Sequence, residues 1–267
     1  MIPDFSYWLI YLVVGVFVGF FAGLLGIGGG SVIVPVLSLI FIAKGYPAAH
    51  VIHMALGTSL AAIIIGSFSG AREHHLHKAV NWQVVRAMTP GILLGTFSGA
   101  VFAYFVTTAF LKYFFVGFIG LLALQLIFDF RPQAHRNLPG AAGQSIFGFI
   151  MGWLSSLAGI GGAVLTITYM TWCNVKMHEA IGTASAIGFP IAVAGTLGYM
   201  VTGLAAGGMP QWSLGYVYLP AWLGISLASY FIAPLGARLA HRLPVKTLKK
   251  IFMLFLVGLA VKMAVSV

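Results

Sequence analysis

Ten apolar stretches, most of them free of charged residues, are the feature that most limits what this chain can fold into. They run over residues 7–25, 31–43, 51–70, 84–106, 113–128, 143–158, 161–173, 180–203, 212–237 and 251–267. A helix of about 20 apolar residues crosses the hydrocarbon core of a bilayer. Only 7% of the residues are charged, against roughly 25% in a soluble domain. The sequence therefore predicts an all-α, polytopic membrane protein and excludes soluble enzymes and nucleic-acid binders.

The two halves of the chain repeat the same motifs. GIGG at 26–29 returns at 159–162, and H-x-A-[L/I]-G-T at 53–58 returns at 178–183. In each half two short apolar stretches flank the glycine cluster, and three longer stretches follow. We therefore predict a duplication, with a first transmembrane repeat over 1–130, a cytoplasmic linker over 131–142 and a second repeat over 143–267. The halves are not chemically equal, because Ala163 and Ala184 stand where the first half has Gly30 and Ser59.

Positive charge indicates how the two repeats are oriented. If each glycine cluster is a turn, eleven basic residues fall on one side of the membrane, namely Arg72, Lys78, Arg86, Arg131, Arg136, Lys176, Arg238, Arg242, Lys246, Lys249 and Lys250. Three fall on the other side, namely Lys44, Lys112 and Lys262. One broken helix per cluster would instead give a split of 6 against 8. Because cytoplasmic loops carry an excess of Lys and Arg, we predict an inverted-topology repeat with both termini in the periplasm.

The glycine clusters are the predicted substrate site. Glycine is unfavourable inside a regular helix, so we expect the helices to be broken at these Gly-rich clusters. The helix after each break begins with free N–H groups, and such an N-terminus suits an anion. Every carboxylate lies at or beyond the end of an apolar stretch, which leaves backbone and hydroxyl groups as ligands. The predicted binding residues are Gly28, Gly29, Gly30, Ser31, Thr58, Ser59, Gly161, Gly162, Thr183 and Ser185, with Gly26 and Gly159 as hinges.

The same residues also allow other interpretations. The glycines could serve only the close packing of helices, and the hydroxyls could bond the preceding turn of their own helix. His53 and His178 occupy equivalent positions and are candidates for a proton relay, with structural capping as the alternative. The HHLH spacing at 74–77 is loose for a metal site. We therefore predict no metal, no cofactor and no catalytic residue.

Two segments carry a resemblance to a known family. Residues 19–35 (GFFAGLLGIGGGSVIVP) resemble the N-terminal signature of the TauE/SafE family of sulfite exporters and related anion permeases, and ALGTSL at 55–60 resembles its second signature. The weaker second copies, at 159–162 and 182–183, fit the duplicated architecture of that family.

The resemblance implies a secondary transporter, not an enzyme, that exports sulfite or a related small sulfur-containing anion or sulfonate across the bacterial inner membrane. Uptake of such an anion, or a channel for another small organic or inorganic anion, is the alternative. The expected partners are the small anionic substrate and membrane lipid, without nucleic acid. A homo-oligomer is compatible with the sequence, which marks no interface.

Overall fold

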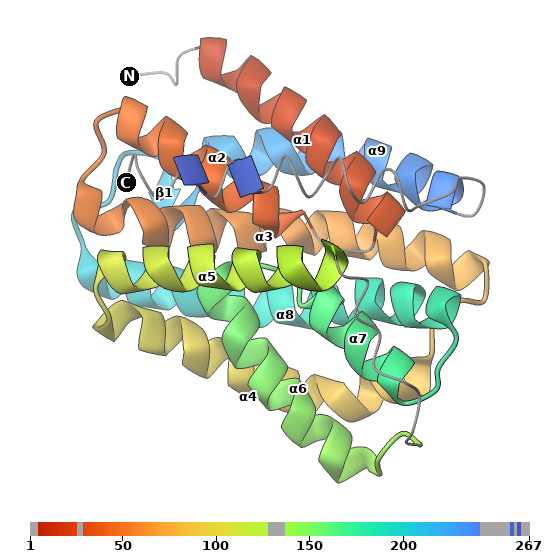
Figure 1. Cartoon of the computed structure of the whole chain (residues 1–267). Coiled ribbons are helices and arrows are strands. Elements are labelled where there is room, and N and C mark those ends of the chain that lie inside the picture. The colour runs from red at the N-terminus through yellow and green to blue at the C-terminus, as the bar shows by residue number, and fades with distance from the viewer. Residues whose placement is uncertain (1–4, 26–28, 128–136, 241–256, 259–260, 263–267) are drawn as a thin grey trace.

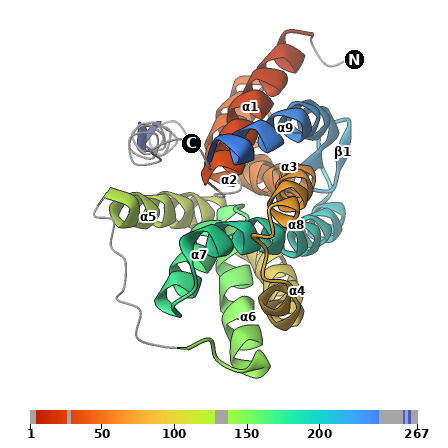
Figure 2. The ribbon, with the colours of Figure 1, turned by 90° about the vertical axis from the view of Figure 1, so that its right-hand side faces the viewer.

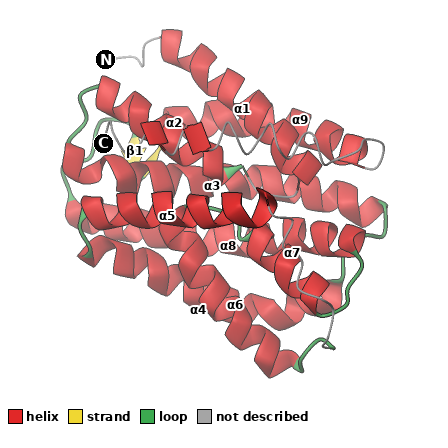
Figure 3. Cartoon of the chain, in the orientation of Figure 1, coloured by secondary structure: helices red, strands yellow, loops and turns green. Residues whose placement is uncertain are grey.

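The computed structural model describes residues 5–25, 29–127, 137–240, 257–258 and 261–262 of the 267-residue chain. Within these ranges nearly all of the chain is helical (Figures 1 and 3). The first half contains α1 (Phe5–Leu25), α2 (Gly30–Ala43), α3 (Ala48–Leu76), α4 (Trp82–Phe105) and α5 (Thr108–Ile127). The second half contains α6 (Ala141–Ala158), α7 (Ala163–Trp172), α8 (Met177–Ala206), β1 (Ser213–Leu214), β2 (Val217–Tyr218) and α9 (Leu219–Ala240). Nine of the ten predicted apolar stretches thus contain a helix, and the tenth, 251–267, lies mostly outside the described residues.

Six of the described helices are long and apolar enough to cross a membrane, judged by length and composition. They are α1, α3, α4, α5, α8 and α9. At a rise of about 1.5 Å per residue, the 14 residues of α2 and the 10 of α7 are too short to span a hydrocarbon core of about 30 Å. The protein is therefore a multi-pass membrane protein in which short helices accompany the longer ones.

The two longest helices, α3 and α8, lie against each other in the middle of the bundle. Helices α1 and α9 pack together on one side of this pair, and α4 and α6 pack together on the other (Figure 2). Each outer pair combines one helix from the first half of the chain with one from the second half. In the predicted duplication α1 would correspond to α6, and α4 to α9. The two halves consequently form one interleaved bundle.

Helices α3 and α8 run in opposite directions. A Cβ atom on Gly57 would lie 3.0 Å from Cβ of Tyr199, whereas a Cβ on Gly70, further along α3, would lie 2.8 Å from Oγ of Ser185, near the start of α8. Equivalent helices that are antiparallel are what an inverted repeat requires. The inverted repeat itself stays a prediction, which this packing supports.

The predicted apolar stretch at 212–237 begins as a β-hairpin and becomes helical only at Leu219. Its strands pair antiparallel, with Ser213 opposite Tyr218 and Leu214 opposite Val217. Gly215, in the turn, has φ +57° and lies so close to α8 that a Cβ atom on it would be 2.2 Å from the Met200 carbonyl oxygen. The sequence did not predict this hairpin, because its tyrosines and aliphatic residues continue the apolar run without a charge.

The bundle has two distinct ends. The hairpin end contains the hairpin, the ends of α2 and α8 and the beginning of α3 (Figure 1). The basic end lies opposite, where α3 and α9 end and α4 and α8 begin. Of the eight Lys and Arg within the described residues, Arg72, Lys78, Arg86, Lys176 and Arg238 belong to the basic end, Lys44 and Lys112 belong to the hairpin end, and Lys262 lies in the short described piece at 261–262.

Candidate functional site

Glycine residues with left-handed backbone conformations lie at three helix termini, namely the start of α2, the end of α6 and the start of α7. Helix α1 ends at Leu25, and Gly29, with φ +63°, precedes α2. Helix α6 ends at Ala158 and is followed by Gly159 with φ +61°, while Gly162 with φ +66° precedes α7. Residues other than glycine rarely adopt these angles. Gly26 and Gly28, predicted as a hinge and as a binding residue, lie outside the described residues.

The two glycine segments contact each other. A Cβ atom on Gly30 would lie only 2.1 Å from the carbonyl oxygen of Gly159, so the backbones of α2 and α6 approach as closely as glycine permits. The hydroxyl of Ser59 donates to the same Gly159 carbonyl at 2.8 Å. The structure thus brings three predicted residues, one from each of α2, α3 and the α6–α7 connection, to one place.

Two buried hydroxyls beside these helix termini have no hydrogen-bond partner among the described residues. Ser31, in the first turn of α2, is 1% exposed, and Ser155, in the last turn of α6, is fully buried. Oγ of Ser155 lies 3.0 Å from the position that a Cβ on Gly162 would take. An unpaired buried hydroxyl costs about 1–3 kcal/mol. These groups are therefore available to bind a polar ligand or water, and Ser155 was not predicted from the sequence.

A small cavity of about 20 Å³ lies on the basic-end side of the glycine segments. Gly161 and Ser185, both predicted binding residues, line it together with Ala163, Ala184 and Ser67. A cavity of this size holds about one water molecule. It is too small for an oxyanion of four heavy atoms, so the described conformation is closed around this part of the predicted site.

The threonines of the repeated motif have equivalent backbone partners at opposite ends. The Thr58 hydroxyl accepts a hydrogen bond from the backbone N–H of Tyr218 at 2.9 Å, and the Thr183 hydroxyl accepts one from Asn81 N–H at 2.9 Å. Tyr218 directly precedes α9 and Asn81 directly precedes α4, which correspond to each other in the predicted duplication. We call these the hairpin-end and basic-end threonine contacts. Because they lie in opposite directions from the centre, Thr58 and Thr183 do not share one site.

The glycine before each threonine lets the connecting segment that the threonine binds lie close to the helix backbone. A Cβ on Gly57 would lie 2.9 Å from the carbonyl oxygen of Tyr216, and one on Gly182 would lie 2.2 Å from that of Ala79. Tyr216 and Ala79 each lie two residues before the N–H donor of the threonine contact. The motif therefore holds the segment that leads into the next helix, once in each half.

The two histidines of the motif have different surroundings. Nε2 of the buried His53 lies 2.9 Å from the Ala103 carbonyl oxygen, and its ring stacks on Tyr216 with centroids 5.0 Å apart. His178 is exposed, at the basic end. The two histidines therefore lie at opposite ends of the bundle, and a proton relay through them stays a prediction. Among the described residues no group of three or more His, Cys, Asp or Glu side chains is placed to hold a metal ion.

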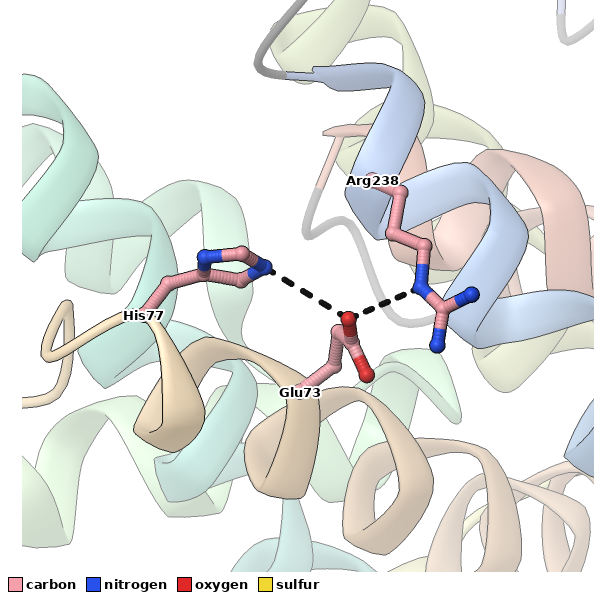
Figure 4. A network of polar contacts seen from close by, with 3 residues as sticks. All are labelled: Glu73, His77 and Arg238. Carbon is pink, nitrogen blue, oxygen red and sulfur yellow. Dashed lines mark hydrogen bonds and ion pairs between the residues drawn. The ribbon is translucent and has the colours of Figure 1, made fainter.

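An ion-pair network, the Glu73 junction, joins α3 to α9 at the basic end (Figure 4). Arg238 Nε donates to Glu73 Oε1 at 2.9 Å, and His77 Nε2 lies 3.5 Å from the same oxygen. The Arg238 pKa is raised by its hydrogen bond to Glu73. A second carboxylate at this end, Glu179, accepts a hydrogen bond from the Asn81 side chain at 2.7 Å.

Comparison with known proteins matches residues 11–263 to the model of a single family, described as sulfite exporter TauE/SafE. The chain belongs to the TauE/SafE family. This agrees with the resemblance carried by residues 19–35 and 55–60, and it makes the protein a membrane transporter of that family. No solved structure matches the chain.

Relatives of this TauE/SafE protein carry general names. A probable membrane transporter protein of Haemophilus influenzae is 36% identical over 260 residues, covering 97% of this chain and 98% of the relative. One of Methanocaldococcus jannaschii is 28% identical over 242 residues, covering 89% and 88%. A third, YdhB of Bacillus subtilis, is 27% identical over 249 residues, covering 90% and 94%. The similarity thus extends over nearly the full length of each of these transporters.

Proposed function

We propose that this TauE/SafE transporter is not an enzyme and exports sulfite, or a related small sulfur-containing anion or sulfonate, across the bacterial inner membrane by alternating access. One observation carries the proposal within the fold: the start of α2 meets the glycine-lined end of α6 inside the bundle, beside the unpaired hydroxyls of Ser31 and Ser155. N–H groups at a helix start and neutral hydroxyls are donors suited to an oxyanion.

The surroundings of this place support an anion rather than a cation as substrate. The carboxylates within the described residues, Glu73 and Glu179, both lie at the basic end and are engaged there by Arg238 and Asn81. Gly30, Gly159 and Ser59 contact one another at the centre, whereas the Thr58 and Thr183 hydroxyls bond segments on opposite sides of it. We therefore propose Gly29, Gly30, Ser31, Ser59 and the 159–162 segment as the centre of the substrate site, with Gly161 and Ser185 on its basic-end side.

The size of the internal cavity supports a carrier rather than an open channel. About 20 Å³ beside Gly161 admits a water molecule but no oxyanion. A carrier must open toward one side to admit its substrate. We propose that the two inverted repeats, 1–130 and 143–267 joined by 131–142, move relative to each other to do so.

We also propose that the basic end faces the cytoplasm and that both termini are periplasmic. Five of the eight basic side chains of the described residues belong to that end, and the other three are Lys44, Lys112 and Lys262, in the sense of the positive-inside rule. An impermeant thiol reagent on intact cells should label Ala49→Cys, at the hairpin end, and spare Gln83→Cys, at the basic end. Both would be made in a Cys173→Ala background, and the reverse labelling would refute the orientation.

The substrate site is tested by removing one hydroxyl. In proteoliposomes, Ser31→Ala should slow sulfite efflux by at least about tenfold, as expected when a buried hydrogen bond of about 1.4 kcal/mol to the substrate is lost. Ser38→Ala is the matched control, because Ser38 is buried on the same helix but already donates to the Val34 carbonyl at 2.8 Å. Equal efflux by both variants would remove Ser31 from the site. A wild-type protein that moves no sulfite would refute the proposed substrate.

A further inference from the structure

A single lysine at the hairpin end is surrounded by aromatic rings. Lys44 caps the C-terminus of α2 and is half-buried. Its Nζ lies 4.4 Å from the ring centroid of Tyr7, 5.4 Å from that of Tyr218 and 5.7 Å from that of Tyr46. Ring faces within about 6 Å attract an ammonium group. We call these residues, together with Tyr11, the Lys44 cage.

The positive charge of this cage has no carboxylate partner among the described residues. The ion pairs formed there by carboxylates belong to Glu73, at the opposite end. Nζ of Lys44 donates one hydrogen bond, to Oη of Tyr218 at 3.4 Å, and an ammonium group has three donors. Burial and a hydrogen bond with Tyr218 raise the pKa of the Tyr46 phenol, so Tyr46 is neutral and supplies no negative charge. Within the described part of the chain, the cage therefore carries the positive charge of Lys44 without a neighbouring carboxylate.

A second donor in the cage also lacks an acceptor. Tyr11 is completely buried, and its hydroxyl has no hydrogen-bond partner among the described residues. Tyr7 and Tyr11 are four residues apart on α1 and so share one face of that helix. The cage thus combines an ammonium group and a buried phenol, both of which would bond a small anion.

Helix α2 connects this cage to the proposed substrate site. It begins at Gly30, against Gly159, and ends beside Lys44. Its 14 residues place the two about 21 Å apart along the helix. We propose that the Lys44 cage is a second anion-binding site, which takes a small oxyanion of the sulfite class on the hairpin-end side of the central site. This inference rests on the proposed function, since it places the cage on the same substrate path.

The recognition chemistry follows from the geometry. The tyrosine rings hold the ammonium without neutralising it, so that its remaining N–H groups can form charge-assisted hydrogen bonds to an oxyanion. Tyr11 would add a neutral O–H donor. Tyr218 is itself fixed, because its backbone N–H is held in the hairpin-end threonine contact.

The test uses the full-length protein in proteoliposomes, with sulfite as the probe. Lys44→Gln should raise the half-saturating sulfite concentration by at least about fivefold, because a charge-assisted hydrogen bond is lost. Lys44→Arg should keep it within about twofold, and Tyr11→Phe should raise it without removing any charge. The matched control is Lys112→Gln, because Lys112 is the other described lysine of this end and lies over one ring, that of Tyr113, at 5.4 Å.

A second measurement separates the cage from the proposed function. Sulfite that binds the folded protein raises its melting temperature in detergent, and part of that rise should be lost in Lys44→Gln but not in Lys112→Gln. If the wild type transports sulfite but Lys44→Gln and Tyr11→Phe behave like Lys112→Gln in both assays, the cage proposal is overturned. If the wild type shows no transport but a Lys44-dependent rise, the proposed function fails and the cage stands. Should Lys44→Gln not fold, Tyr11→Phe decides by the same criteria.

Discussion

The two ends of the molecule share one backbone contact, and they differ in what surrounds their charged side chains. At each end the Gly-Thr pair of the repeated motif holds the segment that leads into α9 or α4. At the basic end the Glu73 junction pairs a carboxylate with Arg238 (Figure 4). At the hairpin end Lys44 lies among tyrosines without a carboxylate in the described residues. The repeated motif therefore accounts for the backbone contact that is found at both ends. Side chains outside the motif account for the different charge at each end.

The largest difference between the ends should come from the motif glycines. Gly182→Ala should reduce the free energy of unfolding by about 3 kcal/mol, at the upper end of the range for overpacking, because the new Cβ would lie 2.2 Å from the Ala79 carbonyl oxygen. Gly57→Ala should cost less, because the corresponding distance to the Tyr216 carbonyl oxygen is 2.9 Å. Melting temperatures in detergent measure both. A larger loss in Gly57→Ala would show that the basic-end segment yields more easily than the hairpin.

Removing the threonine contacts should lower the free energy of unfolding by less than Gly182→Ala does. Here the hairpin end should lose more than the basic end. Thr58→Val leaves the buried N–H of Tyr218 without an acceptor and should cost about 1–3 kcal/mol. Thr183→Val should cost less, because the Asn81 N–H is only partly buried and water can replace the lost acceptor. The free energies of unfolding of the two variants, compared by denaturation in the same detergent, check this. Equal losses would mean that both N–H groups are equally inaccessible to water.

The Glu73 junction should give the smallest effect on stability. Arg238 is exposed, and an ion pair with an exposed member is weakened by water and salt. A double-mutant cycle of Glu73→Gln and Arg238→Gln should show a coupling below the effect of either threonine change, and it should shrink as salt is raised. A coupling that is independent of salt would show instead that the pair is shielded from solvent. The melting temperature at low and high ionic strength is the measurement.

Much of the fold follows from the sequence, because its cause is local. Long runs without charge produce the membrane helices, and in the second half Gly159 and Gly162 lie between the end of α6 and the start of α7. The hairpin at 213–218 was not predicted, because Tyr216, Val217 and Tyr218 look like the first turn of an apolar helix. They form a strand instead because Gly215 packs against the backbone of α8 at Met200. This contact joins distant parts of the chain and cannot be seen in the local sequence.

The candidate site was predicted less completely, because its partners are distant in the sequence. The contact of Gly30 with Gly159, and of Ser59 with the same carbonyl, joins residues at least 100 positions apart. The threonines were proposed as ligands from their hydroxyls alone, and their backbone partners at Tyr218 and Asn81 could not be seen from spacing. The Lys44 cage likewise gathers residues from α1, the α2–α3 connection and β2. No local pattern signals such an assembly.

Helix α2, which connects the two proposed sites, contains a proline. Pro35 lies inside this helix and removes a backbone hydrogen bond from its first turns, so bending is easiest there and the remaining turns move as one body. From Pro35 to Lys44 the helix extends about 13.5 Å, and a swing of about 15° at the proline carries its far tip about 3.5 Å. That travel exceeds the 3.4 Å between Nζ of Lys44 and Oη of Tyr218. Bending of α2 at this proline would therefore shift Lys44 relative to Tyr7 and Tyr218, which lie on other elements, while Gly30 keeps its place against Gly159.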